Sequence, residues 1–121
     1  MLMRSTTLAR SLILLMTSIT LGTTTTLAAS PQPFMTGAQW IGLYESGEPG
    51  KEAAAAYVAG YVDGIHAAEA TARKKRFCVP DDVTEIELAD VVAKYLAGKS
   101  VFRQMGAPFV IDGALKDVYR C

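Results

Sequence analysis

The chain carries two cysteines, Cys78 and Cys121, behind an amino-terminal segment with the pattern of an export signal. An exported chain with one pair of thiols is expected to close them into one disulfide, because compartments outside the cytosol are oxidising. The bond would close a loop of roughly 44 residues, worth about 4 kcal/mol in the chain-entropy model. It would tie the last residue to the middle of the domain. Two oxidised sulfurs are neither metal ligands nor nucleophiles, so the pair also argues against thiol or metal chemistry.

Residues 1–29 have the three parts of a cleavable signal peptide. A short basic region contains two arginines, an apolar stretch covers residues 11–21, and small residues follow up to Ala29. The apolar stretch is too short to cross a bilayer as a helix, which takes about 20 residues. We therefore expect export, a single mature domain over residues 30–121 and no membrane in the mature form. The alternative is a retained amino-terminal anchor.

The charge balance argues against nucleic acid as a partner. The whole chain has twelve basic and twelve acidic residues, and the signal takes two arginines with it, which leaves ten basic against twelve acidic. Nucleic-acid binding requires a basic face that neutralises phosphates, so this balance argues against it. A mature chain of about 92 residues builds one modest core, and a disulfide is a plausible compensating device.

The apolar periodicity predicts an all-α fold, a small bundle of about four helices. Thr36 is a candidate N-cap for a short helix carrying Trp40, Ile41 and Tyr44. Residues 46–50 break this helix, and a long helix is expected from about Lys51 to Lys75. Its apolar stripe consists of Ala54, Tyr57, Val58, Tyr61, Ile65, Ala68 and Ala72.

The third helix has the clearest start. Thr84 and Glu87 fit a capping box, and Val83 and Leu88 fit the hydrophobic staple around it. Gly98 is expected to stop this helix. A last helix should start between Ser100 and Pro108 and run toward Tyr119, with its apolar residues at Val110, Ile111, Ala114, Leu115 and Val118.

Gly60 and Gly64 lie within the long helix, on a stripe with Ala56 and Ala68. Glycine inside a helix costs about 1 kcal/mol relative to alanine, so the pair calls for a reason. Small residues on one stripe allow another backbone to approach closely. The sequence leaves two interpretations open, a close internal helix crossing or a homodimer seam.

No catalytic arrangement can be built from the remaining polar residues. His66 is the single histidine, and both thiols are assigned to a disulfide, so neither a Ser-His-Asp nor a Cys-His site follows. No neighbouring residue gives His66 metal-ligand spacing, and a solvated position on the helix is the favoured interpretation. The sequence predicts no enzyme, no metal and no cofactor.

Two charged runs have a structural interpretation and a functional one. Asp81 and Asp82 belong to an acidic group that continues through Glu85 and Glu87, where the dipole of the third helix favours negative charge. The alternative is an acidic contact surface for a partner. Residues 73–76 are all basic and follow the long helix, where the dipole favours positive charge. The alternative there is attraction to anionic lipid or a cell-wall polymer.

The segment between the last two helices is the first candidate contact with a partner. It contains Phe102, Arg103 and Met105 between Gly98 and Gly106, and the helical periodicity offers these hydrophobes no obvious buried position. Aromatic and arginine side chains are frequent anchors of tight interfaces. The alternative is that Phe102 caps the core. The acidic group at Asp81 and Asp82 is the second candidate surface.

Several of these elements together resemble the Rap/Tai family of immunity proteins. The resemblance spans nearly all of the mature chain, and Ser100 and Arg120 depart from a pattern that favours proline. The matching elements are Phe34-Met35-Thr36-Gly37 with Trp40, residues 57–65 (YVAGYVDGI), residues 77–80 (FCVP), residues 91–96 (VVAKYL), Ala114-Leu115 and Tyr119-Arg120-Cys121.

The resemblance implies an all-helical fold, a Cys78–Cys121 disulfide and homodimers. It also implies a function: a periplasmic immunity protein that inhibits a peptidoglycan amidase effector of type VI secretion by plugging its active-site groove. Two other classes stay open, a periplasmic chaperone or stress protein and another cell-envelope binding protein. A neighbouring gene for a small cysteine-histidine amidase would favour the immunity protein.

Overall fold

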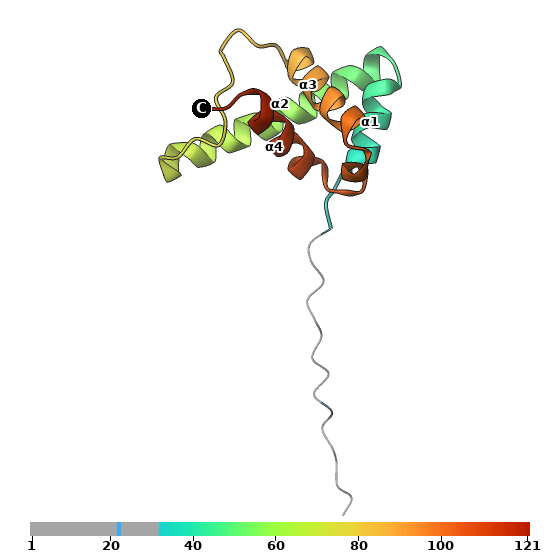
Figure 1. Cartoon of the computed structure of the whole chain (residues 1–121), viewed down its shortest axis with the longest axis horizontal. Helices are drawn as coiled ribbons and strands as arrows, with labels where there is room; N and C mark the ends of the chain where they lie inside the picture. Colours follow the sequence, from blue (N-terminus) through green and yellow to red (C-terminus); the bar gives the residue numbers. More distant parts are fainter. Residues whose placement is uncertain (1–21, 23–31) are drawn as a thin grey trace, which may run out of the picture.

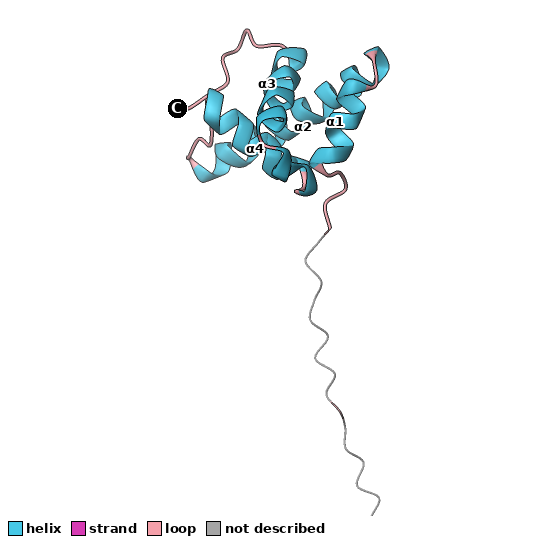
Figure 2. Cartoon of the chain, turned by 45° about the vertical axis from the view of Figure 1, so that its right-hand side comes forward, coloured by secondary structure: helices cyan, strands magenta, loops and turns pink. Residues whose placement is uncertain are grey.

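The computed structural model describes Gly22 and residues 32–121. These residues form four α-helices, α1 (Gly37–Glu45), α2 (Glu48–Ala72), α3 (Glu85–Gly98) and α4 (Ala107–Val118), with a short 3-10 helix, η1 (Ser100–Gln104), between the last two (Figures 1 and 2). The described part contains no strand beyond an isolated bridge between Thr36 and Gly106. The predicted all-α fold is confirmed.

The predicted signal peptide, residues 1–29, lies outside the described residues except for Gly22. Among the residues that the structure describes, no helix is long and apolar enough to span a bilayer.

Capping boxes start two of the helices, one of them at the predicted N-cap Thr36 and one at the predicted box of Thr84 and Glu87. In α1 the Thr36 hydroxyl accepts from the Gln39 N–H and the Gln39 side chain accepts from the Thr36 N–H. In α3 the same reciprocal pair forms between Thr84 and Glu87, so the predicted box is confirmed.

The predicted bounds of the long helix are wrong by three residues at each end. Helix α2 begins at Glu48, because Pro49 suits the first turn of a helix: its φ is fixed near the helical value, and it has no backbone N–H that would lack a hydrogen-bond partner there. It ends at Ala72, because Arg73 adopts the left-handed conformation, with φ 54° and ψ 26°. The Arg73 N–H closes the helix by donating to the Glu69 carbonyl.

The core lies where the four helices meet, and it is filled mainly by Trp40, Phe77, Leu96, Ile111 and Leu115. The indole N–H of Trp40 donates to the Ala54 carbonyl, so its one polar group is satisfied inside the core. Helix α2 packs on α1 and α3 with its first half, and its buried residues end at Val62.

The second half of α2 extends beyond the bundle (Figure 1). The interpretation of Ala68 and Ala72 as buried stripe positions is therefore wrong, because both are exposed. Val118, at the end of α4, is 55% exposed for the same reason: the periodic pattern outlasts the partner helices.

Two ties hold the chain near the end of α2. The predicted disulfide joins Cys78 and Cys121, whose Cα atoms are 5.0 Å apart, and the Cys78 N–H donates to the Tyr119 carbonyl. The second tie is the carboxylate of Asp112 on α4. It accepts hydrogen bonds from Arg76 and Tyr61 and forms an ion pair with Lys116 at 2.8 Å.

These contacts shift two pKa values. Burial alone would raise the pKa of Asp112, but the hydrogen bonds from Arg76, Lys116 and Tyr61 outweigh it and lower the pKa to about 2. Burial, together with the hydrogen bond to Asp112, raises the pKa of Tyr61 to about 12. Both groups therefore keep their ordinary charge at neutral pH, and the cluster acts as a structural joint between α2, the following loop and α4.

Candidate interaction site

The η1 segment connects α3 to α4 and has no buried residue. It begins after Lys99, which leaves the helical region with φ −140° and ψ 65°. Two short backbone bonds shape the segment, from the Phe102 N–H to the Lys99 carbonyl and from the Met105 N–H to the Phe102 carbonyl. Gly98 is the last residue of α3, as predicted, although it does not take a left-handed conformation.

Phe102 is half-buried, and its ring stacks on Tyr95 with centroids 5.7 Å apart. The ammonium group of Lys99 lies 4.3 Å from the Tyr95 ring centroid and 5.8 Å from that of Phe102. Phe102 also packs against the core cluster. The structure thus favours the interpretation in which Phe102 caps the core, and its outer edge remains open.

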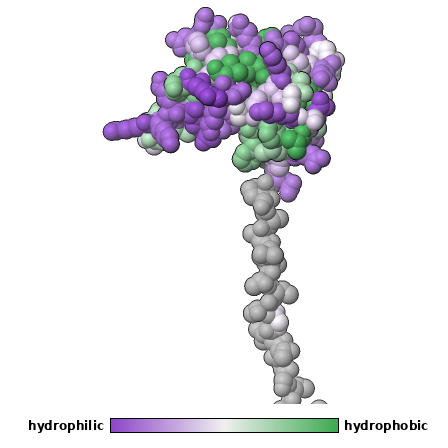
Figure 3. Space-filling model, viewed as in Figure 1, coloured by the Kyte–Doolittle hydropathy of each residue, from purple (hydrophilic) through white to green (hydrophobic). Residues whose placement is uncertain are grey.

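Three of the exposed hydrophobes at this end are Val101, Met105 and Phe109, which we call the apolar pole. Val101 is 74% exposed, Met105 42% and Phe109 71%. Figure 3 shows hydrophobic surface at this end of the domain, just above the grey trace. A small groove of about 110 Å³ runs between Met105 and Phe109, and Tyr95, Phe102 and Val110 complete its lining.

The candidate segment predicted from the sequence included Val101 and Met105 but missed Phe109. Phe109 does not belong to the buried stripe of α4, which contains Val110 and Ile111. Its position outside the periodic pattern could have identified it as an exposed hydrophobe. Arg103, the other predicted anchor, is exposed on η1. The apolar pole and Arg103 together present three hydrophobes and a cation on one short segment and the helix start after it.

The apolar pole is held against the start of α1. The Gly37 N–H donates to the Met105 carbonyl and the Ala107 N–H donates to the Met35 carbonyl, both at 2.8 Å. Gly37 is buried against η1, and a Cβ atom there would lie 2.8 Å from the Phe102 carbonyl oxygen. Backbone bonds on both sides therefore fix the segment, which reduces the ordering cost of binding through it.

The second candidate surface lies elsewhere. Asp81 and Asp82 are exposed in the turn before α3, whereas η1 follows the other end of that helix. Fourteen helical residues separate the two ends, a length of about 20 Å at 1.5 Å per residue. The structure does not bring the two predicted contact surfaces together.

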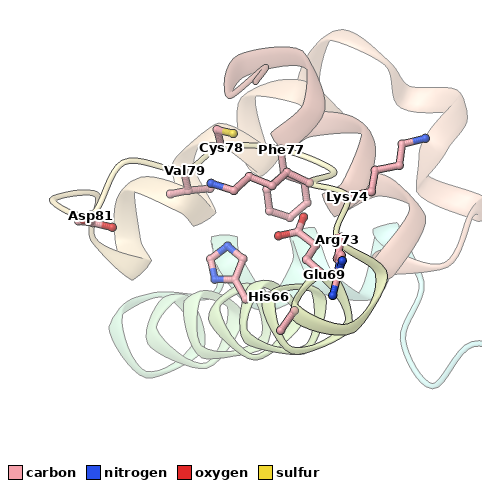
Figure 4. Close-up of a pocket in the computed structure, with 10 residues that line it drawn as sticks. His66, Glu69, Arg73, Lys74, Phe77, Cys78, Val79 and Asp81 are labelled. Carbon is pink, nitrogen blue, oxygen red and sulfur yellow. The ribbon is translucent and has the colours of Figure 1, made fainter.

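Asp81 instead borders a cleft of about 510 Å³ between α2 and the loop that follows it. In Figure 4, His66 and Glu69 project from α2 toward the loop that carries Phe77 and Val79. His66 is exposed, as predicted, and its ring centroid lies 6.5 Å from that of Phe77. The sequence did not predict this cleft, because the loop that forms one of its walls is positioned by the disulfide between Cys78 and the distant Cys121.

Gly60 and Gly64 are exposed, and a Cβ atom added at either would meet nothing within 4 Å. The interpretation as a close internal helix crossing at these glycines is therefore wrong, because no other part of the described chain lies close to either of them. A shallow depression next to it is lined by Ala56, Tyr57, Gly60 and Tyr61.

In the described ranges, no three histidine, cysteine, aspartate or glutamate side chains gather as they would around a metal ion. Most of the shifted pKa values belong to groups that hydrogen-bond one another, such as Asp112 with Arg76 and Asp90 with Tyr44 and Lys51, whereas burial raises the pKa of the Tyr119 hydroxyl.

A family model for Rap1a immunity proteins matches residues 36–121, from the N-cap of α1 to the disulfide at Cys121. The chain belongs to the Rap1a immunity protein family. The predicted resemblance is thus confirmed over every helix of the domain. Membership of the Rap1a family indicates a protein that binds a partner effector protein and acts as an inhibitor without chemistry of its own. No match was found among curated proteins or among solved structures.

Proposed function

We propose that this chain is a periplasmic immunity protein that inhibits a peptidoglycan amidase effector of type VI secretion. It would bind by placing η1 and the apolar pole over the active-site groove of the effector. Family membership supports the class of partner. The observation that carries the proposed binding mode is the exposure of Val101, Met105 and Phe109. They lie on η1 and the start of α4, which backbone hydrogen bonds hold against the start of α1.

The energetics favour this surface over the acidic turn. Exposed apolar side chains gain free energy when a partner covers them, at roughly 25 cal/mol per Å². Phe109 and Arg103 are of the residue types that most often anchor an interface. Asp81 and Asp82 contribute charge at an exposed site, where an ion pair is typically worth less than about 1 kcal/mol.

Residues 1–29 support the periplasmic location, since their pattern is that of a cleavable export signal. Fractionation of cells that express the full-length chain tests this part. A protein that stays in the cytosol with its full mass would contradict export.

Titration calorimetry of the mature chain with a candidate amidase effector of the same organism tests the binding mode. Phe109→Ala and Arg103→Ala should each weaken binding by about tenfold or more, as expected for interface anchors. Val118→Ala is the matched control, because Val118 is an exposed hydrophobe at the opposite end of α4. Its affinity should stay unchanged.

The remaining outcomes discriminate the alternatives. If Asp81→Asn and Asp82→Asn weaken binding and the two anchor variants do not, the acidic turn is the contact surface. A chain that binds no amidase contradicts the choice of effector, and a chain that binds without inhibiting contradicts occlusion.

We further propose that the small-residue stripe at Gly60 and Gly64 forms the seam of a homodimer. It is exposed and open in the single chain, and the internal alternative is wrong. Gly60→Leu with Gly64→Leu should leave the fold intact and lower the mass measured by sedimentation. A variant that sediments like the wild type would show that the stripe has no role in association.

A further inference from the structure

The exposed end of α2 concentrates the positive charge of the domain. Arg73, Lys74, Lys75 and Arg76 follow one another there, and Lys116 of α4 lies beside them. They are five of the ten basic residues that follow the predicted signal, in a domain with an acidic excess. We call these five residues the basic tip. The proposed inhibitory surface does not include it, because η1 lies at another end of the molecule (Figure 1).

The loop of the basic tip is anchored by some of its residues and open at others. Arg76 donates two hydrogen bonds to the Asp112 carboxylate, and Phe77 is buried in the core. Arg73 takes the left-handed conformation that turns the chain away from the helix axis. Lys74 and Lys75, between these fixed points, are exposed and form no ion pair with any described carboxylate.

Two hollows flank this loop, and Lys74 and Lys75 line both. One is the cleft with Phe77 and Val79, shown in Figure 4. The other, of about 460 Å³, has an apolar floor of Ile65, Ala68 and Ala72. Glu69 borders both hollows, but one of its oxygens already accepts the Arg76 N–H at 2.6 Å.

Helix-dipole complementarity does not account for this arrangement. The dipole favours positive charge at the C-cap Arg73, but its effect falls off within about one turn and does not explain why Lys74 and Lys75 line two hollows. Long basic side chains over an apolar floor suit a ligand that offers both carboxylates and aliphatic groups. A flat anionic bilayer would meet the charges but would leave both hollows unfilled.

We propose that the basic tip binds an acidic segment of a partner protein, in extended conformation, with carboxylates on Lys74 and Lys75 and aliphatic side chains on the Ile65–Ala72 floor. This contact is separate from the one proposed for η1. It gives the domain a second protein-binding surface whose affinity depends on charge.

The test uses the mature, disulfide-bonded chain and a short synthetic peptide of alternating glutamate and leucine, followed by NMR titration. Amide signals of residues 65–77 and Lys116 should shift, and those of η1 should not. Raising the ionic strength from about 0.01 M to about 0.15 M shortens the Debye length from about 30 Å to about 8 Å and should weaken binding. The peptide with glutamine in place of glutamate should not bind.

Charge reversal assigns the site. Lys74→Glu and Lys75→Glu should each weaken peptide binding about five- to tenfold, the range expected when an exposed attraction becomes a repulsion. Lys94→Glu is the matched control, because Lys94 is an exposed lysine on α3 without an ion pair in the described structure, and it should bind as the wild type does.

Three results would overturn the proposal: no binding of the acidic peptide at low salt, equal binding of the glutamine peptide, or equal effects of Lys75→Glu and Lys94→Glu. The last experiment measures binding of the chain to vesicles that contain phosphatidylglycerol. Binding to those vesicles without binding to the peptide would assign the basic tip to lipid and overturn the protein partner.

Discussion

The two ends of α4 are held in opposite ways. From its middle onward, α4 is tied down: Asp112 gathers Tyr61, Arg76 and Lys116, and the disulfide at Cys121 follows the end of the helix. At its amino end, α4 is joined to α1 by backbone hydrogen bonds, while Phe109 points to solvent. One end depends on polar and covalent ties, and the other leaves apolar surface uncovered.

The difference separates stability from recognition. The Asp112 carboxylate is 14% exposed and has three partners, so it contributes to folding. An apolar side chain that stays exposed gains little from folding and gains free energy only when something else covers it. We therefore expect substitutions at the tied end to lower the free energy of unfolding, and those at the apolar pole to lower affinity instead.

The largest effect should come from the disulfide. Cys78→Ser with Cys121→Ser removes a covalent link across 43 positions and should lower the free energy of unfolding by about 4 kcal/mol. Denaturant titration measures the loss. Hydrogen exchange then tests the comparison: the backbone amide at position 78 should lose protection, while those of Gly37 and Ala107 keep theirs. Equal loss at both ends would show that they unfold as one unit.

Asp112→Ala should rank second. It leaves Arg76, Lys116 and the Tyr61 hydroxyl without their shared partner, at a cost of about 2–4 kcal/mol for a largely buried group. Asp117→Ala is the control, because its exposed pair with Arg120 should contribute less than about 1 kcal/mol. Similar losses in the two variants would mean that the Asp112 cluster is no stronger than a surface ion pair.

The pH dependence of unfolding should report the same cluster. The pKa of Asp112 falls from 3.8 to about 2 in the folded chain, so its contribution is present above pH 4 and is lost as the pH falls toward 2. Asp112→Asn should flatten the stability curve in that window. A wild-type curve that is already flat there would contradict the lowered pKa.

The smallest effect on folding should come from the apolar pole. Phe109→Ser should change the free energy of unfolding by less than about 0.5 kcal/mol, because the side chain is mostly exposed. Ile111→Ala, two residues along the same helix but fully buried, should cost about 2–5 kcal/mol. Comparable losses in both would show that Phe109 belongs to the core and not to a binding surface.

Local sequence determined most of the helical framework. The Thr84–Glu87 box, the breaks near Ser46 and Gly98, and the stripe of α4 from Val110 to Leu115 depend on residues within a few positions of one another. Such short-range patterns act through hydrogen bonds and helical periodicity, which the chain carries wherever it folds. The disulfide was equally predictable, because two cysteines allow one pairing.

Tertiary structure decided what those helices expose. Periodicity marked Ala68 and Ala72 as core and offered Gly60 and Gly64 for an internal crossing, yet in the described chain both alanines are exposed and no other helix approaches the two glycines. The partners of Asp112 come from α2, from the loop after it and from α4. Arg76, for example, is more than thirty positions from Asp112 in the sequence. Whether a helix face is covered depends on where its neighbours end, and that is a property of packing between distant segments.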